Sequence, residues 1–241
     1  MTLATRGYLQ KKMLERKLRN MEIKGVIFDM DGLMIDTEKH YNYYLCKAAN
    51  ELGFPMKREH ALMLRSLDER LAGPLMQQYL GAGYDHQSVL TLYRGYVNEY
   101  FSSHEIEVKP GLFELLQYLQ KHHYITCVAT ATEKNRACSF LNKIGAAPYF
   151  SYLCSGKDLE HSKPAPDIYL KTAAEMGLAP ENCIALEDSP NGVRAAHGAG
   201  CCTIMVPDLT QPDEELRGMI FAKADTLEAV IDIIETTVPA E

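Results

Sequence analysis

Short runs of apolar and β-branched residues recur along the chain and predict buried β-strands. The runs cover residues 24–29, 124–130, 149–154, 183–186 and 202–206. Between the later runs, apolar positions follow a helical period at residues 112–121, 133–144, 167–176 and 190–198. Strands that alternate with helices form parallel β-α units, so the pattern predicts the α/β class with a doubly wound parallel sheet.

The region between the first two predicted strands has a different pattern. From about residue 39 to residue 108, one helical stretch follows another without a convincing strand. This is too long for a single crossover and suits a small helical domain inserted after the first strand. The Lys109-Pro110-Gly111 turn signal marks the return to the sheet. We therefore expect a basic extension at 1–21, a Rossmann-like core at 22–38 and 109–241, and an inserted helical domain at 39–108.

Composition narrows the classes of function. The chain has 241 residues, of which 46% are hydrophobic and 24% are charged, with a formal net charge of −7. These values are typical of a globular protein, and the acidic balance argues against nucleic acid as a partner. No apolar run approaches the ~20 residues that span a bilayer, so we expect no membrane partner.

The cysteines and the first residues bear on location. The seven cysteines form no C-x-x-C pair, and Cys127 and Cys183 lie inside apolar runs, as is typical of buried thiols in a reducing cytosol. We expect a cytoplasmic monomer. The first twenty residues carry six Lys/Arg and one Glu without an apolar stretch, so they are not a secretory signal. A surface helix, an upstream extension and a basic helix that contacts a membrane or partner remain open.

Polar residues with catalytic potential follow the predicted strands. They are Asp29 and Asp31 after the first strand, Thr130, Ala131 and Thr132 after the second, Lys163 in a turn before a helix, and Glu187 and Asp188 after the fourth. Ligands of open parallel sheets bind beyond the carboxyl ends of the strands. We therefore expect these segments, which lie far apart in sequence, to meet at one edge of the sheet.

Taken in order, these segments resemble the haloacid dehalogenase-like (HAD) superfamily of aspartate-nucleophile phosphotransferases. The matching motifs are FDMDGLMIDTE, ATAT, SKPAPDIY and LEDSPNGVRAAHGAG, and the resemblance runs from about residue 22 to residue 206. A D-x-D-G triplet alone occurs by chance, but all four motifs in order make a strong signal. The most similar branch contains β-phosphoglucomutase-like proteins and sugar- or nucleotide-phosphate phosphatases. Its members carry a helical cap after the first strand, which the segment at 39–108 fits.

Hydrolysis of a phosphate monoester requires a nucleophile, a proton for the leaving oxygen and neutralisation of the phosphoryl oxygens. The resemblance implies that Asp29 is the nucleophile and forms an aspartyl-phosphate, and that Asp31 protonates the leaving group and then activates water. It assigns Lys163 to charge neutralisation and to holding Asp29. The candidates for phosphate or substrate contact are Thr130, Ala131, Thr132, Glu38 at the entry to the cap and Arg65 within it.

Two anions, a carboxylate and a phosphate, repel each other unless a cation lies between them. Mg²⁺ prefers octahedral oxygen ligation through a few carboxylates, substrate and water. The resemblance implies Mg²⁺ as the cofactor, held by the Asp29 carboxylate, the Asp31 backbone carbonyl and Asp188. Glu187 stands alongside, as a ligand or as a neighbour of the ligands.

Each motif also has a purely local interpretation. The Asp29-x-Asp31 pair suits a turn that ends a strand, and the threonines and Asp188 suit helix caps. A calcium loop is excluded, because its fifth and twelfth positions are Leu33 and His40, which are not ligands there. Lys163 alone would be interpreted as a surface lysine. These interpretations explain each segment but not the coincidence of four, which favours catalysis.

The cap segment LMLRSLDERLAG bears on the substrate. In β-phosphoglucomutases this segment places a Gly and then an Arg that grips a second phosphate, whereas Ser66 and Glu69 stand at those positions here. Arg65 and Arg70 are close but out of register. The sequence therefore favours a phosphatase that acts on a sugar or nucleoside phosphate. The alternatives are a phosphosugar mutase and a non-catalytic binding module.

Overall fold

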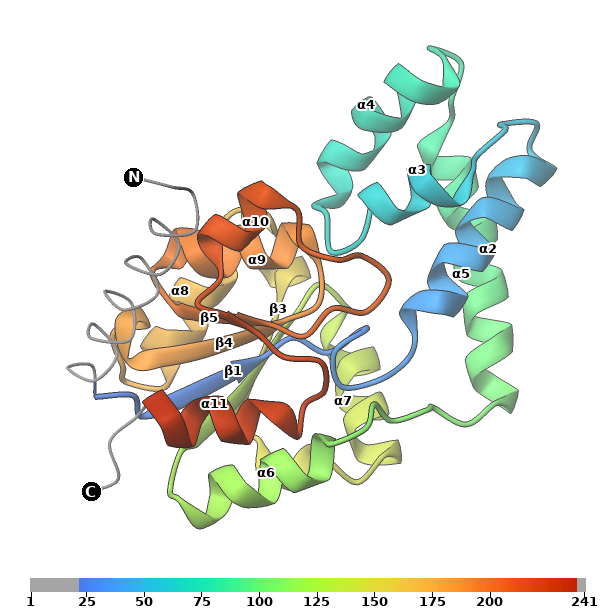
Figure 1. Cartoon of the computed structure of the whole chain (residues 1–241). Coiled ribbons are helices and arrows are strands. Elements are labelled where there is room, and N and C mark those ends of the chain that lie inside the picture. The colour runs from blue at the N-terminus through green and yellow to red at the C-terminus, as the bar shows by residue number, and fades with distance from the viewer. Residues whose placement is uncertain (1–21, 238–241) are drawn as a thin grey trace, which may run out of the picture.

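The computed structural model describes residues 22–237, so the basic extension predicted at residues 1–21 lies outside the described residues. A parallel sheet of six strands, in the order β3-β2-β1-β4-β5-β6, forms the centre of the described part (Figure 1). The strands are β1 (Gly25–Phe28), β2 (Ile125–Thr130), β3 (Tyr152–Ser155), β4 (Cys183–Glu187), β5 (Cys202–Met205) and β6 (Ala222–Lys223). The predicted α/β class with a parallel sheet is confirmed.

Helices cover both faces of this sheet. They are α6 (Leu112–Lys121), α7 (Lys134–Lys143), α8 (Asp167–Glu175), α9 (Pro190–Ala199), α10 (Glu214–Met219) and α11 (Ala229–Thr237). Successive residues of a strand point to opposite faces, so Val26 and Phe28 pack in the cluster with α6, α7 and α11, while Ile27 packs with α8 and α9. The strands are therefore buried on both faces, which explains their continuous apolar runs.

Two details differ from the sequence expectation. The run at 149–154 forms a strand only from Tyr152, because Ala147–Tyr149 form a 3₁₀ helix that contains Pro148. Strand β6 has two residues, too few for an apolar pattern to be detected. Both differences lie at an edge of the sheet, so the central strands are unaffected.

Four further helices lie between β1 and α6 in the chain and group apart from the sheet (Figure 1). They are α2 (Glu38–Glu51), α3 (Arg58–Met63), α4 (Glu69–Leu80) and α5 (His86–Ser103). We call residues 38–103 the helical insert. Its helices bury an apolar cluster of their own. Where the chain leaves and rejoins the sheet, the Asp36 N–H donates to the Glu107 carbonyl at 2.9 Å and the Lys109 N–H donates to that of Met34 at 2.9 Å.

Within residues 22–237, each helix is either too short or too polar to cross a lipid bilayer.

Candidate active site

The carboxyl ends of the central strands bring two acidic segments together. Phe28, the last residue of β1, pairs in register with Val128 and Leu186, which lie close to the carboxyl ends of β2 and β4, so the three strands end near one another. The Asp29 N–H continues the ladder and donates to the Leu186 carbonyl at 3.0 Å. Asp29 and Asp188 are buried side by side at this edge, as expected from their positions after the strands.

Lys163 enters this edge from the loop before α8 and is completely buried. Its ammonium donates to Asp29 Oδ1 at 2.5 Å, to Glu187 Oε1 at 2.6 Å and to the Ala129 carbonyl at 3.1 Å. Burial disfavours the charged form, but the two carboxylates outweigh it and raise the pKa of Lys163 above its usual value. The interpretation of Lys163 as a surface residue is therefore wrong.

The Asp31 carboxylate lies among three hydroxyl groups. Thr37 Oγ1 donates to Asp31 Oδ1 at 2.7 Å, and Thr132 Oγ1 donates to Oδ2 at 2.7 Å. Thr130 Oγ1 lies 3.4 Å from the same oxygen and accepts from the Thr132 N–H at 3.0 Å. The segment 130–132 is thus brought to Asp31. Thr37 was not predicted, because a threonine before a helix is ordinarily a cap.

Two aspartates that were expected to bind the metal each have a buried carboxylate oxygen without a hydrogen-bond partner among the described residues. These oxygens are Asp29 Oδ2 and Asp188 Oδ1. Burial raises the pKa of both carboxyl groups well above the usual value, although Lys163 opposes the rise for Asp29 and Arg65 opposes it for Asp188. Ligand oxygens of Asp29, Glu187 and Asp188 lie within 4.8 Å of one another. Buried oxygens of this kind need a cation, so the residues fit Mg²⁺.

Glu187 differs from the two aspartates. Its Oε1 accepts from Lys163 at 2.6 Å and from the Tyr169 hydroxyl at 2.5 Å, while its Oε2 lies 3.2 Å from the Asp188 N–H and 3.3 Å from Ser189 Oγ. Both oxygens are therefore occupied by protein donors, which leaves Asp29 and Asp188 with the freer ligand atoms. Tyr169 was not predicted, since a tyrosine within a helical pattern carries no signal beyond core packing.

Arg65 is the contribution of the helical insert to this edge. It is buried, and its guanidinium donates to Asp188 Oδ2 and, at 3.2 Å, to Thr210 Oγ1. Its Nε lies 3.3 Å from Glu38 Oε2 and its Nη2 lies 3.5 Å from Asp208 Oδ2. Burial raises the pKa of Glu38 to about 8, against the opposing charge of Arg65. Asp208 was not predicted, yet its position just after β5 is the signal that identified the other acids.

Hydrogen bonds join the loop that carries Arg65 to the core. The Asp68 N–H donates to the Lys163 carbonyl at 2.7 Å, and Asp68 Oδ2 accepts from the Ser162 N–H at 2.9 Å. Asn191 Nδ2 donates to the Arg65 carbonyl at 2.9 Å. Ser66 has a φ of +54°, a left-handed conformation that favours glycine. A glycine was the residue expected at this position from the resemblance.

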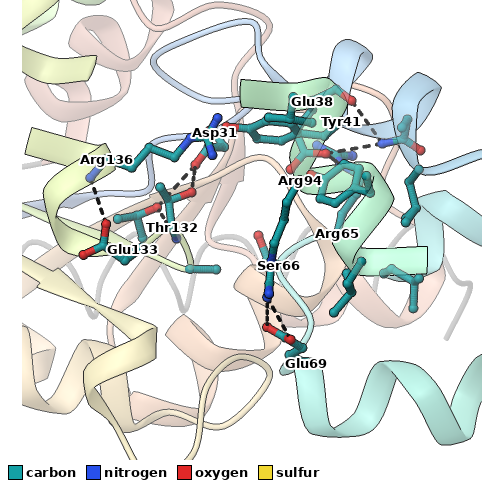
Figure 2. A pocket seen from close by; sticks show the side chains of 18 of the residues that line it. Asp31, Glu38, Tyr41, Arg65, Ser66, Glu69, Arg94, Thr132, Glu133 and Arg136 are labelled. Carbon is teal, nitrogen blue, oxygen red and sulfur yellow. Dashed lines mark hydrogen bonds and ion pairs between the residues drawn. The ribbon is translucent and has the colours of Figure 1, made fainter. Parts of the chain in front are cut away.

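A cavity of about 900 Å³ lies between this edge and the helical insert. Asp29, Asp31, Glu38 and Ala131 line one end of it, and Figure 2 shows the side chains around it. The far end holds a cluster of charged residues. Glu69 accepts from Arg94 Nη2 at 2.9 and 3.0 Å and from Lys157 Nζ at 2.5 Å. Arg70 is directed elsewhere, to Asp68 and the Glu160 carbonyl.

Comparison with known proteins supports the resemblance. The family model described as haloacid dehalogenase-like hydrolase matches residues 26–206. The chain is 28% identical over 181 residues to the "Phosphorylated carbohydrates phosphatase" of Thermotoga maritima, covering 74% of this chain and 82% of that protein. It is 30% identical over 200 residues to the "Probable pseudouridine-5'-phosphatase" of Drosophila melanogaster, covering 78% and 83%.

A solved structure extends the likeness to the fold. The crystal structure of β-phosphoglucomutase from Clostridium difficile superposes with a TM-score of 0.75 at 19% identity, covering 89% of this chain and 97% of that chain. At this identity the match bears on the fold alone. The relatives named as phosphatases confirm the enzyme class predicted from the sequence, a phosphoric monoester hydrolase.

Proposed function

The chain belongs to the haloacid dehalogenase-like hydrolase family, and we propose that it is a Mg²⁺-dependent phosphatase that forms an aspartyl-phosphate on Asp29. The asymmetry of the Asp29 carboxylate carries the proposal. Lys163 holds Oδ1 at 2.5 Å, whereas Oδ2 has no hydrogen-bond partner among the described residues. An oxygen with free lone pairs, on a carboxylate fixed in one orientation beside a cavity, meets the requirement for a nucleophile.

In the first step, an Asp29 oxygen attacks phosphorus and the bond from phosphorus to the leaving oxygen breaks. Asp31 gives its proton to that oxygen, so the leaving group departs as an alcohol. In the second step, Asp31 takes a proton from water, the water oxygen attacks phosphorus, and Asp29 is released with inorganic phosphate. The hydroxyls of Thr37, Thr130 and Thr132 suit both states of Asp31, because a hydroxyl can donate to a carboxylate or accept from a carboxylic acid.

The acids at this edge of the sheet would bind the metal. The Asp29 carboxylate, Asp188 with its unpartnered oxygen and the Asp31 carbonyl would hold Mg²⁺, with Glu187 alongside. When bound, the cation supplies charge neutralisation for the carboxylates and the phosphoryl oxygens. Lys163 keeps Asp29 oriented and offsets the charge of Glu187. Arg65 carries a further positive charge from the helical insert, which we propose acts as the cap.

We propose a sugar or nucleoside phosphate as the substrate. The support is the cavity of about 900 Å³, which suits a ligand of that size, and the names of the two relatives, one a phosphatase of phosphorylated carbohydrates and one of pseudouridine 5'-phosphate. A cytoplasmic monomer without a nucleic-acid partner stays a prediction from the sequence.

A phosphosugar mutase is the alternative function. A mutase must bind a sugar with two phosphates, and Glu69, the acid at the position expected to hold the gripping arginine, lines the cavity here. Glu69 is paired with Arg94 and Lys157, so no arginine stands at the position of the expected grip, which favours the phosphatase. A non-catalytic module is disfavoured by the complete set of acids, hydroxyls and lysine.

Phosphate release from a panel of monoesters, measured with Mg²⁺ and with a chelator, tests the proposal. The panel should hold hexose, pentose and nucleoside phosphates together with an aryl phosphate. We expect metal-dependent release concentrated on one chemical class. Release that persists in the chelator would contradict the metal requirement. No phosphate release from any ester would contradict the phosphatase activity. Bisphosphate-dependent isomerisation with little phosphate release would establish the mutase.

A further inference from the structure

The cations that line the cavity differ in how they are neutralised. Arg65 is paired with Asp188, Glu38 and Asp208, and Arg94 and Lys157 share Glu69. Arg136, in the first turn of α7, also lines the cavity. Among residues 22–237 it has no acidic partner within ion-pair distance. It is thus the cation that the protein leaves available for a ligand.

The side chain of Arg136 is nevertheless ordered by neutral contacts. Its Nη1 donates to Asn98 Oδ1 of α5 at 3.0 Å, and its guanidinium carbon lies 5.3 Å from the centre of the Phe140 ring. Its Nε is buried and has no hydrogen-bond partner among the described residues. A buried N–H without a partner is costly, and a ligand acceptor would satisfy it. These contacts orient the guanidinium while leaving donors for a ligand.

Arg136 lies on the side of the cavity where the leaving group must be. Figure 2 shows it extending from its helix toward Asp31, the proposed proton donor to the leaving oxygen. Tyr41 and Tyr93 form the neighbouring wall. Burial raises the pKa of both tyrosines, Asp31 raises it further and Arg136 lowers it, so both rings are within electrostatic reach of these two charges. The part of the substrate that meets Arg136 is therefore the part that departs with the leaving oxygen.

We propose that Arg136 binds a second anionic group, a carboxylate or a phosphate, on the leaving-group portion of the substrate. A guanidinium presents a planar fork of donors that matches either anion. This subsite, which rests on the proposed phosphatase activity, narrows the substrates to phosphate esters that carry a second anionic group besides the ester phosphate. It uses a residue of the core in place of an arginine at position 69, where this chain has an acid.

Two matched pairs of esters test the subsite. In the pair 2-phosphoglycerate and glycerol 2-phosphate, a carboxylate replaces a hydroxymethyl group, and in the pair glucose 1,6-bisphosphate and glucose 6-phosphate, a second phosphate is added. We expect kcat/KM, measured as phosphate release with Mg²⁺, to favour the member with the second anionic group in at least one pair by about 30-fold. A preference in the first pair identifies a carboxylate, and one in the second identifies a phosphate.

Variants then assign the preference to Arg136. R136Q should bring the ratio of kcat/KM within the preferred pair close to one, mainly through KM, and R136K should keep part of the ratio because the charge remains but the fork is lost. K134Q is the matched control, because Lys134 is an exposed cation of the same helical turn that does not line the cavity. It should leave the ratio unchanged. Circular dichroism and thermal unfolding check that each variant folds.

The outcomes separate the subsite from the activity on which it rests. If the wild type hydrolyses both members of each pair equally, or if R136Q preserves the preference, the Arg136 subsite is wrong and the phosphatase stands. If the wild type hydrolyses none of the four esters and no aryl phosphate, both assignments fall. A ratio that changes equally in K134Q would also overturn the subsite, because helix charge alone would then explain it.

Discussion

The two ends of the cavity are built in different ways. At the catalytic end, the side chains of Lys163 and Glu187 are fully buried and that of Asp29 is 2% exposed, with contacts of 2.5 and 2.6 Å between the ions. At the far end, the side chains of Arg94, Lys157 and Glu69 are 49%, 45% and 34% exposed. The ions at the catalytic end lie at buried strand ends, where the low dielectric makes their interactions strong. The ions at the far end are partly exposed, so water screens the interactions between them. The comparison places the fixed charges that the proposed chemistry needs at the catalytic end.

Removal of the nucleophile should give the largest effect. D29N keeps the shape of Asp29 but cannot form the acyl phosphate, so we expect kcat to fall by at least about 10³-fold. The matched control is D225N, because Asp225 is an exposed acid with an 87% exposed side chain. D225N should keep full activity. The measurement is single-turnover phosphate release, with circular dichroism to show that the fold is retained. If D29N retained more than a small residual activity, Asp29 would not be the nucleophile.

Replacement of one lysine at each end sharpens the comparison. K163M leaves Asp29 and Glu187 buried without their cation, which should lower the free energy of unfolding by about 3–5 kcal/mol and kcat by about 10²-fold or more. K157M removes a half-exposed lysine from Glu69 and should change the free energy of unfolding by less than about 1 kcal/mol. Urea denaturation of both variants measures the difference. Equal destabilisation by the two substitutions would contradict the contrast between a buried and a screened end.

The loss in K163M should also depend on pH. Burial raises the pKa of Asp29 in the folded state above its unfolded value. Ionisation of such a group opposes folding at high pH, and the stability returns as pH falls through the folded pKa. Lys163 opposes the rise in the wild type, so without it the deficit should be smaller at pH 5 than at pH 8. A deficit that grows toward low pH would refute this account.

The catalytic end was largely predictable from the sequence because strands give a strong local signal. An apolar run followed by Asp29 and Asp31, and another followed by Asp188, place acids at a shared edge once the sheet is parallel. Lys163 has no strand before it, and only its resemblance to a family motif identified it. Asp208 follows β5 and obeys the same strand-end rule, so a stricter use of that rule would have found it.

The residues that face each other across the helical insert and the core were not predictable, because their positions depend on how these two parts pack. Arg136 is an ordinary first-turn cation in the helical pattern, and its place in the cavity depends on how α5 meets α7. Arg65 was predicted only as a substrate contact out of register with a motif, and its pairing with Asp188 depends on how the loop between α3 and α4 meets the core. The helical period of a sequence predicts which face of a helix is apolar, but it does not predict which element packs against that face.

The hydrogen bond from the Ser162 N–H to Asp68, which joins the helical insert to the core, predicts an effect of intermediate size. D68A loses both the acceptor for the Ser162 N–H and the cap of α4, where Asp68 accepts from the Arg70 N–H at 3.0 Å. We expect about a 10-fold fall in kcat/KM, because a loosened insert positions the substrate less well, and about 1 kcal/mol of lost stability. D68S retains a capping hydroxyl but is too short to reach Ser162. It should show the kinetic loss without the loss of stability, and an unimpaired D68S would disconnect this contact from catalysis.

The smallest effect concerns Ser66, whose φ of +54° is unfavourable for a side chain with a Cβ. S66G should stabilise the protein by about 0.5–1 kcal/mol, because glycine adopts this conformation without the steric penalty. Gly53, with a φ of +83° and open space where a Cβ would stand, provides the reverse control, since G53S should destabilise by a similar amount. Urea denaturation of the two variants measures both. If S66G destabilises the protein while G53S does so as expected, the Ser66 side chain must make a contact worth more than the strain.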